Sequence, residues 1–154
     1  MDHIEQAIAQ LALNDYVGFW PRVLASLVDT LALMLVVAPT MIAIYGMDAL
    51  QGSNEQFAVL GFWDVVINYV FPTVAVLGFW HYFAATPGKM LINASIVDAE
   101  TLSKASNKQL IIRYLGYFVS SLPLGLGFFW IAFDKRKQGW HDKMANTVVR
   151  RSRD

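Results

Sequence analysis

The sequence VLASLVDTLALMLVVAPTMIAIY, residues 23–45, decides the fold class of this chain. It is an apolar run in which Asp29 is the only charged residue. Because a helix rises about 1.5 Å per residue, about 20 such residues cross the hydrocarbon core of a bilayer. A carboxylate in that position costs on the order of 2.5–3.5 kcal/mol on insertion scales. We therefore expect residues 23–45 to span a membrane and Asp29 to face protein, water or an opposite charge.

The composition favours a small integral membrane protein over a soluble domain. Of the 154 residues, 56% are hydrophobic and 16% are charged, and the mean hydropathy is +0.41. Soluble domains carry about 45–50% apolar and about 25% charged residues. The net charge is zero, which gives no reason to expect a nucleic-acid partner.

We expect a single membrane domain, residues 1–154, that divides into six segments. Residues 1–21 form an N-terminal amphipathic segment, because Ile4, Ile8 and Leu11 recur at helical spacing. The other segments are spans at 23–45 and 62–83, a cytoplasmic loop at 84–109, a broken apolar segment at 110–133 and a basic cytoplasmic tail at 134–154.

The positions of the basic residues set the expected topology. Residues 46–61 contain no Lys or Arg, whereas the tail after Phe133 contains seven. Because basic residues favour the cytoplasmic side, we expect both termini in the cytoplasm. Three full spans would place the tail outside, so the third apolar block is expected to enter, turn at Pro123–Gly127 and return as a re-entrant hairpin. The alternative is a third, kinked span with an exported tail.

Two short β-strands are predicted on the cytoplasmic side, at Ile92–Val97 and Thr147–Arg150. A re-entrant third segment would leave both strands on one side of the membrane, where they could pair. The expected fold is therefore an all-α membrane protein. It has two transmembrane helices, a third apolar segment broken by Pro and Gly, and a small cytoplasmic β element.

Asp29 and Arg22 are the first candidates for a functional site. They are seven residues apart, about two turns along one helix face. An embedded carboxylate beside a positive charge can exchange a proton for a cation near neutral pH. Asn68, Asp64 and Arg113 could complete such a cation- or proton-binding site. The structural alternative is that Asp29 holds the helices together by pairing with Arg113 or by hydrogen bonding to Asn68.

Simpler explanations are available for several other polar residues. Asp64 falls where lipid headgroups are expected, and Arg113 is expected to extend to the cytoplasmic interface. His141 and Asp142 are interpreted as a structural turn, because no orienting group or nucleophile accompanies them. The chain has no Cys and its three His lack metal-ligand spacing, so we expect no metal, no cofactor and no catalytic residue.

Seven short stretches carry a family resemblance and together cover nearly the whole chain. They are Gly18–Arg22 with Asp29, Ala85–Leu91, Ile96–Asp98, Gly125–Trp130, Phe133–Asp134, Gly139–Ala145 and Thr147–Val149. In this order they resemble the RDD family of small bacterial membrane proteins, named for one arginine and two aspartates. The resemblance implies that Arg22 and Asp29 are the arginine and the first aspartate. Asp134 or Asp142 would be the second, with His141 in the same motif as Asp142.

The resemblance also implies a transport role in the bacterial inner membrane, which in some members is monovalent-cation/proton exchange. We therefore expect a transport-type protein, an antiporter among the options, with the lipid bilayer, monovalent cations and protons as partners. A homo-oligomer is expected because one chain has too few spans to enclose a pathway. The alternative is a non-transporting membrane anchor or assembly partner whose buried charges are structural.

Overall fold

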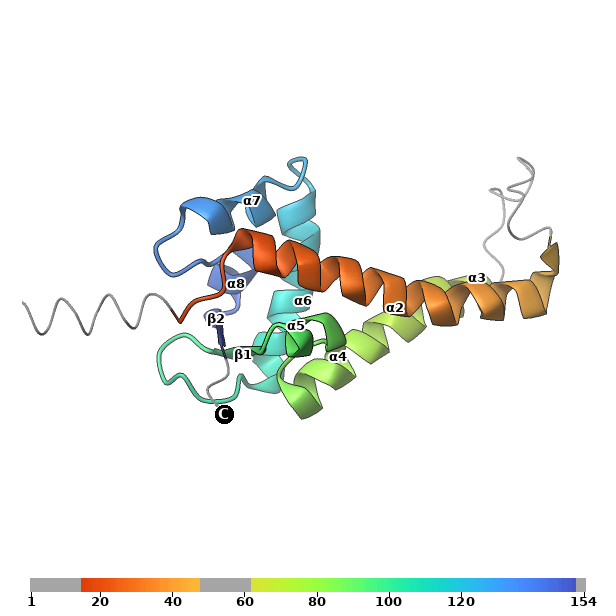
Figure 1. The fold of residues 1–154 in the computed structure, drawn as a ribbon, viewed down its shortest axis with the longest axis horizontal. Helices are drawn as coiled ribbons and strands as arrows, with labels where there is room; N and C mark the ends of the chain where they lie inside the picture. Colours follow the sequence, from red (N-terminus) through yellow and green to blue (C-terminus); the bar gives the residue numbers. More distant parts are fainter. Residues whose placement is uncertain (1–14, 48–61, 152–154) are drawn as a thin grey trace, which may run out of the picture.

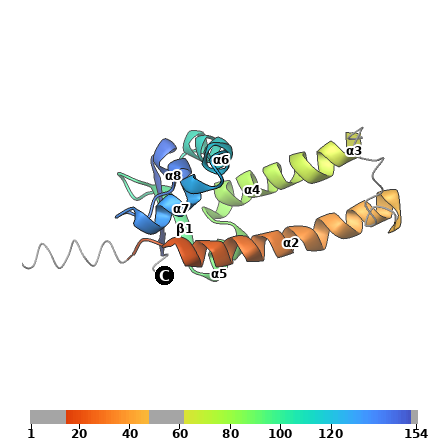
Figure 2. The same cartoon turned by 90° about the horizontal axis from the view of Figure 1, so that it is seen from above.

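The computed structural model describes residues 15–47 and 62–151, which form two long helical arms and a compact body (Figure 1). The arms leave the body beside one another, as the view in Figure 2 shows. Most of the amphipathic segment predicted for residues 1–21 lies outside the described residues. The described part confirms the predicted fold class, a helical membrane protein with a small β element.

The first arm is helix α2, Phe19–Tyr45, and it confirms the first predicted span. Its 27 residues give a length of about 40 Å, which exceeds the roughly 30 Å core of a bilayer. The helix begins four residues earlier than predicted, so Arg22 lies inside its first turn rather than before it. It ends at Gly46, whose φ of +74° suits a residue without a side chain.

The second arm is a continuous helical run over the predicted second span, Phe62–Phe83. It consists of α3 (Phe62–Val65), the π-helical turn η3 (Val66–Val70) and α4 (Phe71–Phe83). Pro72 follows the π turn after one residue, Phe71. Because proline lacks an N–H and its ring crowds the carbonyl four residues earlier, the wider turn fits the chain around it.

Thr86, Pro87 and Gly88, in the loop predicted at 84–109, form the start of a short helix. Helix α5, Pro87–Leu91, has Thr86 as its N-terminal flanking residue and Pro87 in its first turn, where the missing N–H is not needed. It leads into strand β1, Ala94–Asp98, which pairs antiparallel with β2, Thr147–Arg151. The two predicted strands are therefore confirmed, with their ends shifted by one or two residues.

The third apolar block is broken where the sequence predicts. Helix α6, Asn107–Ser121, and helix α7, Leu126–Phe133, meet at an angle of 103°. Gly125 lies in the break with a φ of +78°. Because β1 precedes α6 and pairs with β2, which follows α7, both ends of the broken block lie on one side of the molecule. This arrangement agrees with a hairpin rather than with a straight third helix.

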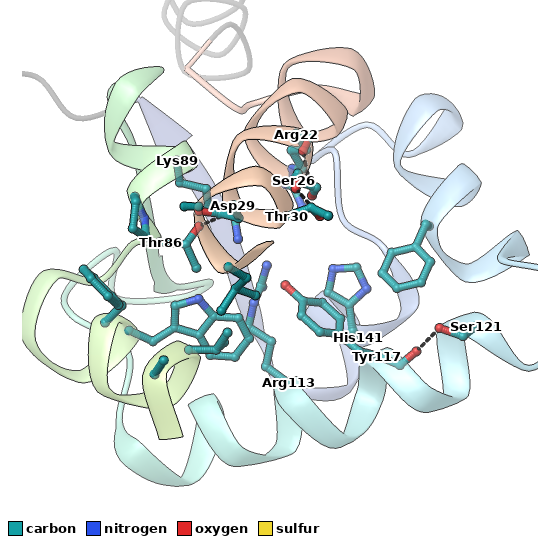
Figure 3. Close-up of a pocket in the computed structure, with 18 of the residues that line it drawn as sticks. Arg22, Ser26, Asp29, Thr30, Thr86, Lys89, Arg113, Tyr117, Ser121 and His141 are labelled. Carbon is teal, nitrogen blue, oxygen red and sulfur yellow. Dashed lines mark hydrogen bonds between the residues drawn. The ribbon is translucent and has the colours of Figure 1, made fainter. Parts of the chain in front are cut away.

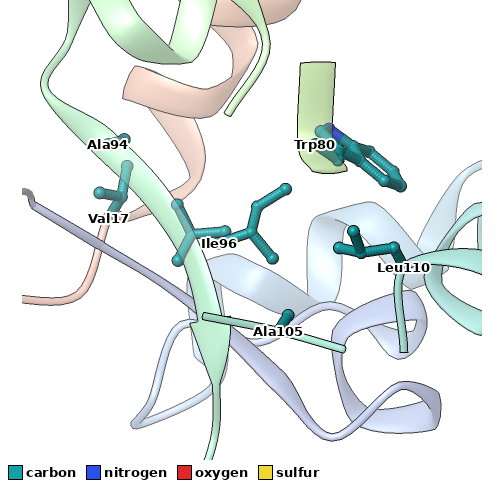
Figure 4. Packing of buried hydrophobic residues seen from close by; sticks show 7 residues of the cluster. Val17, Trp80, Ala94, Ile96, Ala105 and Leu110 are labelled. Atoms are coloured by element: carbon teal, nitrogen blue, oxygen red, sulfur yellow. The ribbon is translucent and has the colours of Figure 1, made fainter. Parts of the chain in front are cut away.

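A small hydrophobic core holds the body together (Figure 4). Ile96 of β1 and Val149 of β2 are completely buried, and Trp80 at the base of α4 packs into the same cluster with Leu110 of α6. Along the arms, by contrast, large apolar side chains such as Leu35 are exposed, as expected for helices that face lipid. The body thus fixes the bases of α2 and α4, where the polar residues gather.

Candidate functional site

Asp142 is the centre of a buried charge cluster in the body. Its carboxylate accepts a hydrogen bond from Arg22 at 2.6 Å and another from Arg113. The backbone N–H of Gly139 donates to it at 3.0 Å, as at the N-terminus of many helices, because Asp142 lies in the first turn of α8, Trp140–Met144. Arg113 also donates to the hydroxyl of Thr147, at 2.9 Å. Asp142 is completely buried, so these donors replace its hydration.

Arg22 is directed toward Asp142 rather than toward Asp29. Its Nε donates to the carbonyl of Val17 at 2.9 Å, and a terminal nitrogen donates to the carbonyl of Lys137 at 2.6 Å. The guanidinium therefore ties the start of α2 to the segment around α8, far along the sequence. Arg22 and Asp29 were expected to act together on one helix face, but in the structure each of them binds its own set of partners.

Arg113 corrects the expectation of a side chain that extends to the membrane interface. It is 1% exposed, because α8 packs directly over α6 and supplies Asp142 as its partner. The guanidinium carbon also lies 5.4 Å from the centre of the Trp80 ring, close enough for a cation–π interaction. Arg113 is therefore an internal residue of the body, and its ion pair is not with Asp29.

Asp29 binds the start of helix α5. One of its oxygens accepts a hydrogen bond from the hydroxyl of Thr86 at 2.5 Å, and the other accepts from the backbone N–H of Gly88 at 2.7 Å. A carboxylate is favourable there because the first N–H groups of a helix lack partners within it. Gly88 allows the approach, since a Cβ on it would lie 2.0 Å from the carbonyl oxygen of Ala25. These two hydrogen bonds offset the cost of placing the Asp29 carboxylate in the apolar helix α2. Neither Asn68 nor Arg113 contributes to them.

Asn68 and Asp64 do not join this site. The Asn68 amide donates to the Asp64 backbone carbonyl at 3.1 Å and lies 3.9 Å from the sulfur of Met41. Both residues belong to the outer part of the second arm, in or beside the π turn. The structure therefore separates these two candidates from Asp29 within its described residues.

Asp134 and Asp142, the two candidates for the second signature aspartate, have different surroundings. Asp134 pairs with the ammonium of half-exposed Lys143 at 2.5 Å and accepts from the N–H groups of Arg136 and Gln138. Burial alone would raise its pKa, but Lys143 and the two N–H groups hold the pKa below its usual value. Asp134 thus orders an outer turn, while Asp142 is the aspartate that pairs with Arg22.

His141 lies between the charge cluster and helix α6. Its Nδ1 is 3.2 Å from the hydroxyl of Ser120, and its Nε2 is 3.4 Å from the Asp142 carboxylate. Burial lowers the pKa of His141 strongly, and the nearby Arg113, Arg22 and Lys89 lower it further, so the imidazole is neutral near pH 7. The order of Ser, His and Asp resembles a hydrolase triad, but Ser120 is completely buried and Asp142 is already bound by two arginines.

A cavity of about 630 Å³ opens beside these residues, where the bases of the arms meet the body (Figure 3). Figure 3 shows Asp29, Thr86 and Lys89 together, with Tyr117 and His141 across the cavity. Its apolar wall includes Leu33 and Val36 of α2 and Phe71, Val76 and Phe79 of α4. Its polar wall includes Arg22, Ser26, Asp29, Thr30, Thr86, Lys89, Arg113, Tyr117, Ser121 and His141.

Lys89 was not predicted as a site residue from the sequence. In the structure it is 8% exposed, lines the cavity, and places its ammonium 5.6 Å from the centre of the Trp80 ring. The available signal was its position two residues after Pro87, in the first turn of a helix that returns toward Asp29. A lysine in such a short helix between two apolar segments is expensive unless protein surrounds it.

The chain has relatives among known proteins. The model of the RDD family matches residues 16–146. Over 74 residues the chain is 45% identical to an uncharacterized protein, RP437, of Rickettsia prowazekii (strain Madrid E); the match covers 48% of the chain and 40% of that relative. Over 146 residues it is 27% identical to an uncharacterized membrane protein, YteJ, of Bacillus subtilis (strain 168), covering 92% of the chain and 84% of the relative. No solved structure matches the chain.

Proposed function

The chain is a membrane protein of the RDD family, and we propose that it is a transport-type protein whose ligand site is the cavity between the arms and the body. The observation that supports this proposal is the make-up of the cavity wall. Charged groups such as Asp29, Lys89 and Arg113 line it together with apolar residues of both arms. Ionisable residues in or beside membrane-spanning segments are costly and commonly mark pathways for ions or substrates. A cavity of this volume is also typical of a small-molecule site.

We propose further that the protein lies in the bacterial inner membrane as a multi-pass protein with both termini in the cytoplasm, and that it acts as a homo-oligomer. The basic tail supports the orientation through the positive-inside rule, and the pairing of β1 with β2 supports a broken segment that returns to its own side. A cysteine introduced by Ser152→Cys is then expected to react with an impermeant thiol reagent only from the cytoplasmic side. Labelling from the periplasm would contradict this orientation.

The transport proposal can be tested by thiol accessibility, since the natural chain has no cysteine. Thr30→Cys places a thiol on an exposed position of the cavity wall, and Leu35→Cys places one on the lipid-facing side of the same helix. In right-side-out and inverted vesicles, an impermeant maleimide is expected to label Thr30→Cys from both sides, because a transporter exposes its site alternately. Leu35→Cys is expected to stay unlabelled. Labelling of Thr30→Cys from one side only would overturn transport and leave a one-sided binding site.

Monovalent-cation/proton exchange through Asp29 is the second candidate, and the oxygen atoms around Asp29 favour it. Hydroxyls of Ser26, Thr30 and Thr86 line the same cavity as the carboxylate, and such oxygens suit hard cations. Exchange would require Asp29 to share the oxygens that now accept from Thr86 and Gly88. In inverted vesicles, Asp29→Asn is then expected to abolish the collapse of a proton gradient on addition of Na⁺ or K⁺. Unchanged exchange would rule out this role.

The non-transporting alternative makes a different prediction for the same variant. If Asp29 serves only to hold α5 against α2, Asp29→Asn lowers the yield of folded protein without any change in ion movement by the protein that folds. The tight closure of Asp142 by Arg22 and Arg113 supports such a structural role for part of the charge cluster. Measuring folded yield and exchange on the same membranes separates the two functions. We propose no chemical reaction for this protein.

A further inference from the structure

We propose that the ligand of this cavity is an anionic amphiphile, a membrane phospholipid whose negatively charged headgroup binds Lys89 and whose acyl chain lies between α2 and α4. This inference rests on the proposal that the cavity is the ligand site, and it names the class of molecule that fits. Two features of the wall carry it: the Lys89 ammonium without an acceptor at the polar end, and an apolar lining that extends along both arms.

The polar end of the cavity presents an ammonium group that lacks a hydrogen-bond acceptor. Within the described residues, the Lys89 ammonium has no hydrogen-bond partner, although the side chain is more than nine-tenths buried. The indole N–H of Trp80 and the Nε–H of Arg113 are also buried without an acceptor. All three side chains line the same cavity, and the Lys89 ammonium and the Arg113 guanidinium lie 5.6 Å and 5.4 Å from the centre of the Trp80 ring. Unmatched buried donors are costly, so an acceptor-rich ligand is favoured here.

Both nearby carboxylates already have hydrogen-bond donors of their own, and this sets the sign of the ligand. The two oxygens of Asp29 accept from Thr86 and from Gly88, and Asp142 is bound by two arginines behind the wall. Three cations, Arg22, Lys89 and Arg113, thus face two carboxylates, and one positive charge is unmatched. A phosphate diester headgroup supplies one negative charge and several acceptor oxygens, so it satisfies both needs.

The rest of the cavity selects a molecule with a long apolar part. Residues of α2 and α4 form facing apolar walls, with Val36 on one side and Phe71 and Phe79 on the other. A second apolar cavity of about 250 Å³ continues along α2 and shares Thr30 and Leu33 with the first. The arms themselves have the length and composition of membrane spans, so the space between them opens at the depth of lipid chains. A small free anion would leave this apolar lining empty.

The closing experiment compares two lipids with matched acyl chains on the purified full chain in detergent. Native mass spectrometry measures how much phosphatidylglycerol and phosphatidylcholine stay bound from an equal mixture. The wild type is expected to retain phosphatidylglycerol about tenfold better, which corresponds to one charge-assisted contact. Lys89→Gln is expected to lose this preference. Lys104→Gln removes the same charge at an exposed site and is expected to keep it.

Several outcomes would overturn the inference. Equal retention of the two lipids by the wild type, or an unchanged preference in Lys89→Gln, would do so. Displacement of the lipid by inorganic phosphate would show that the anion alone is recognised, without its chain.

A second measurement does not depend on whether Lys89→Gln folds. Phosphatidylglycerol brominated in its acyl chain is expected to quench the fluorescence of wild-type protein more than the brominated phosphatidylcholine does. Trp80→Phe is expected to remove that difference, because Trp80 lines the cavity beside Lys89. Equal quenching by the two lipids would contradict the proposal. Two-sided labelling of Thr30→Cys without a lipid preference would overturn this inference and leave the transport proposal in place.

Discussion

Replacement of Asp142 by asparagine tests whether the fold depends on its buried charge. Asp142→Asn keeps the size of the side chain and removes only its negative charge. Arg22 and Arg113 would then face each other across a neutral amide, and both are almost completely buried. The amide keeps one acceptor oxygen but replaces the other with an N–H donor, so it cannot compensate two guanidinium groups. The variant is therefore expected to fold less stably, with its defect confined to the junction of α2, α6 and α8.

The size of this effect follows from the burial of the three side chains. Removing one partner of a buried ion pair costs about 3–5 kcal/mol, because the other partner stays buried without compensation. Domains of about 150–250 residues lose roughly 2–4 °C in Tm per kcal/mol. The two ranges together give a decrease of roughly 6–20 °C for Asp142→Asn.

The assay is thermal unfolding of the purified chain in detergent, followed by far-ultraviolet circular dichroism. Glu100→Gln is the matched control, because Glu100 is exposed and is expected to change stability by less than about 0.5 kcal/mol. The double variant Asp142→Asn with Arg113→Met removes one uncompensated charge. It is expected to be less destabilised than the sum of its two single variants. An Asp142→Asn Tm within about 2 °C of the wild type would refute the reasoning.

Two further predictions concern close packing and pH. Gly88→Ala is expected to destabilise the protein by about 3 kcal/mol, because the new Cβ would lie 2.0 Å from the carbonyl oxygen of Ala25. At Gly78 a Cβ meets open space, so Gly78→Ala is expected to be neutral or stabilising in the same unfolding assay. The pKa of His141 is lowered in the folded protein, so the imidazole stays neutral there, whereas the unfolded chain binds a proton as the pH falls below about 6.5. The free energy of unfolding of the wild type is therefore expected to decrease by up to about 1.4 kcal/mol per pH unit below that value. His141→Gln is expected to remove this pH dependence, and His81→Gln is expected to leave it; equal pH slopes in the wild type and His141→Gln would contradict the assignment.

The spans and strands could be predicted from the sequence because each depends on local properties. The apolar residues 23–45 and 62–83 are long enough to cross a bilayer, and the structure has helices over both. The break predicted at Pro123–Gly127 also depends on local properties, since proline and glycine disfavour one continuous helix through this segment. The predicted re-entrant segment would leave both strands on one side of the membrane, where they could pair, and the structure pairs them.

The partners of the charged residues could not be predicted in the same way. Arg22 and Asp142 are separated by 120 residues, and no spacing rule connects positions so far apart. The family resemblance left Asp134 and Asp142 as alternatives, and only the docking of α8 on α6 distinguishes them. The expectation that Arg113 extends to the interface assumed lipid around α6, whereas α8 covers that face. Helix α5, the partner of Asp29, lies in the segment 84–109 that the sequence predicts as a loop.

The same contacts divide the charges into a fixed set and an available one. Asp142 holds Arg22 and Arg113 in place, and Asp29 is held by the start of α5, so four of the five charged groups at this junction have hydrogen-bond partners within the described residues. Lys89 is the remaining one, and it is positioned by the same helix that Asp29 binds. A change at Asp29 is therefore expected to displace Lys89 as well. Loss of lipid preference in Asp29→Asn, with the charge of Lys89 intact, would show that the carboxylate acts by positioning the lysine rather than by binding a cation itself.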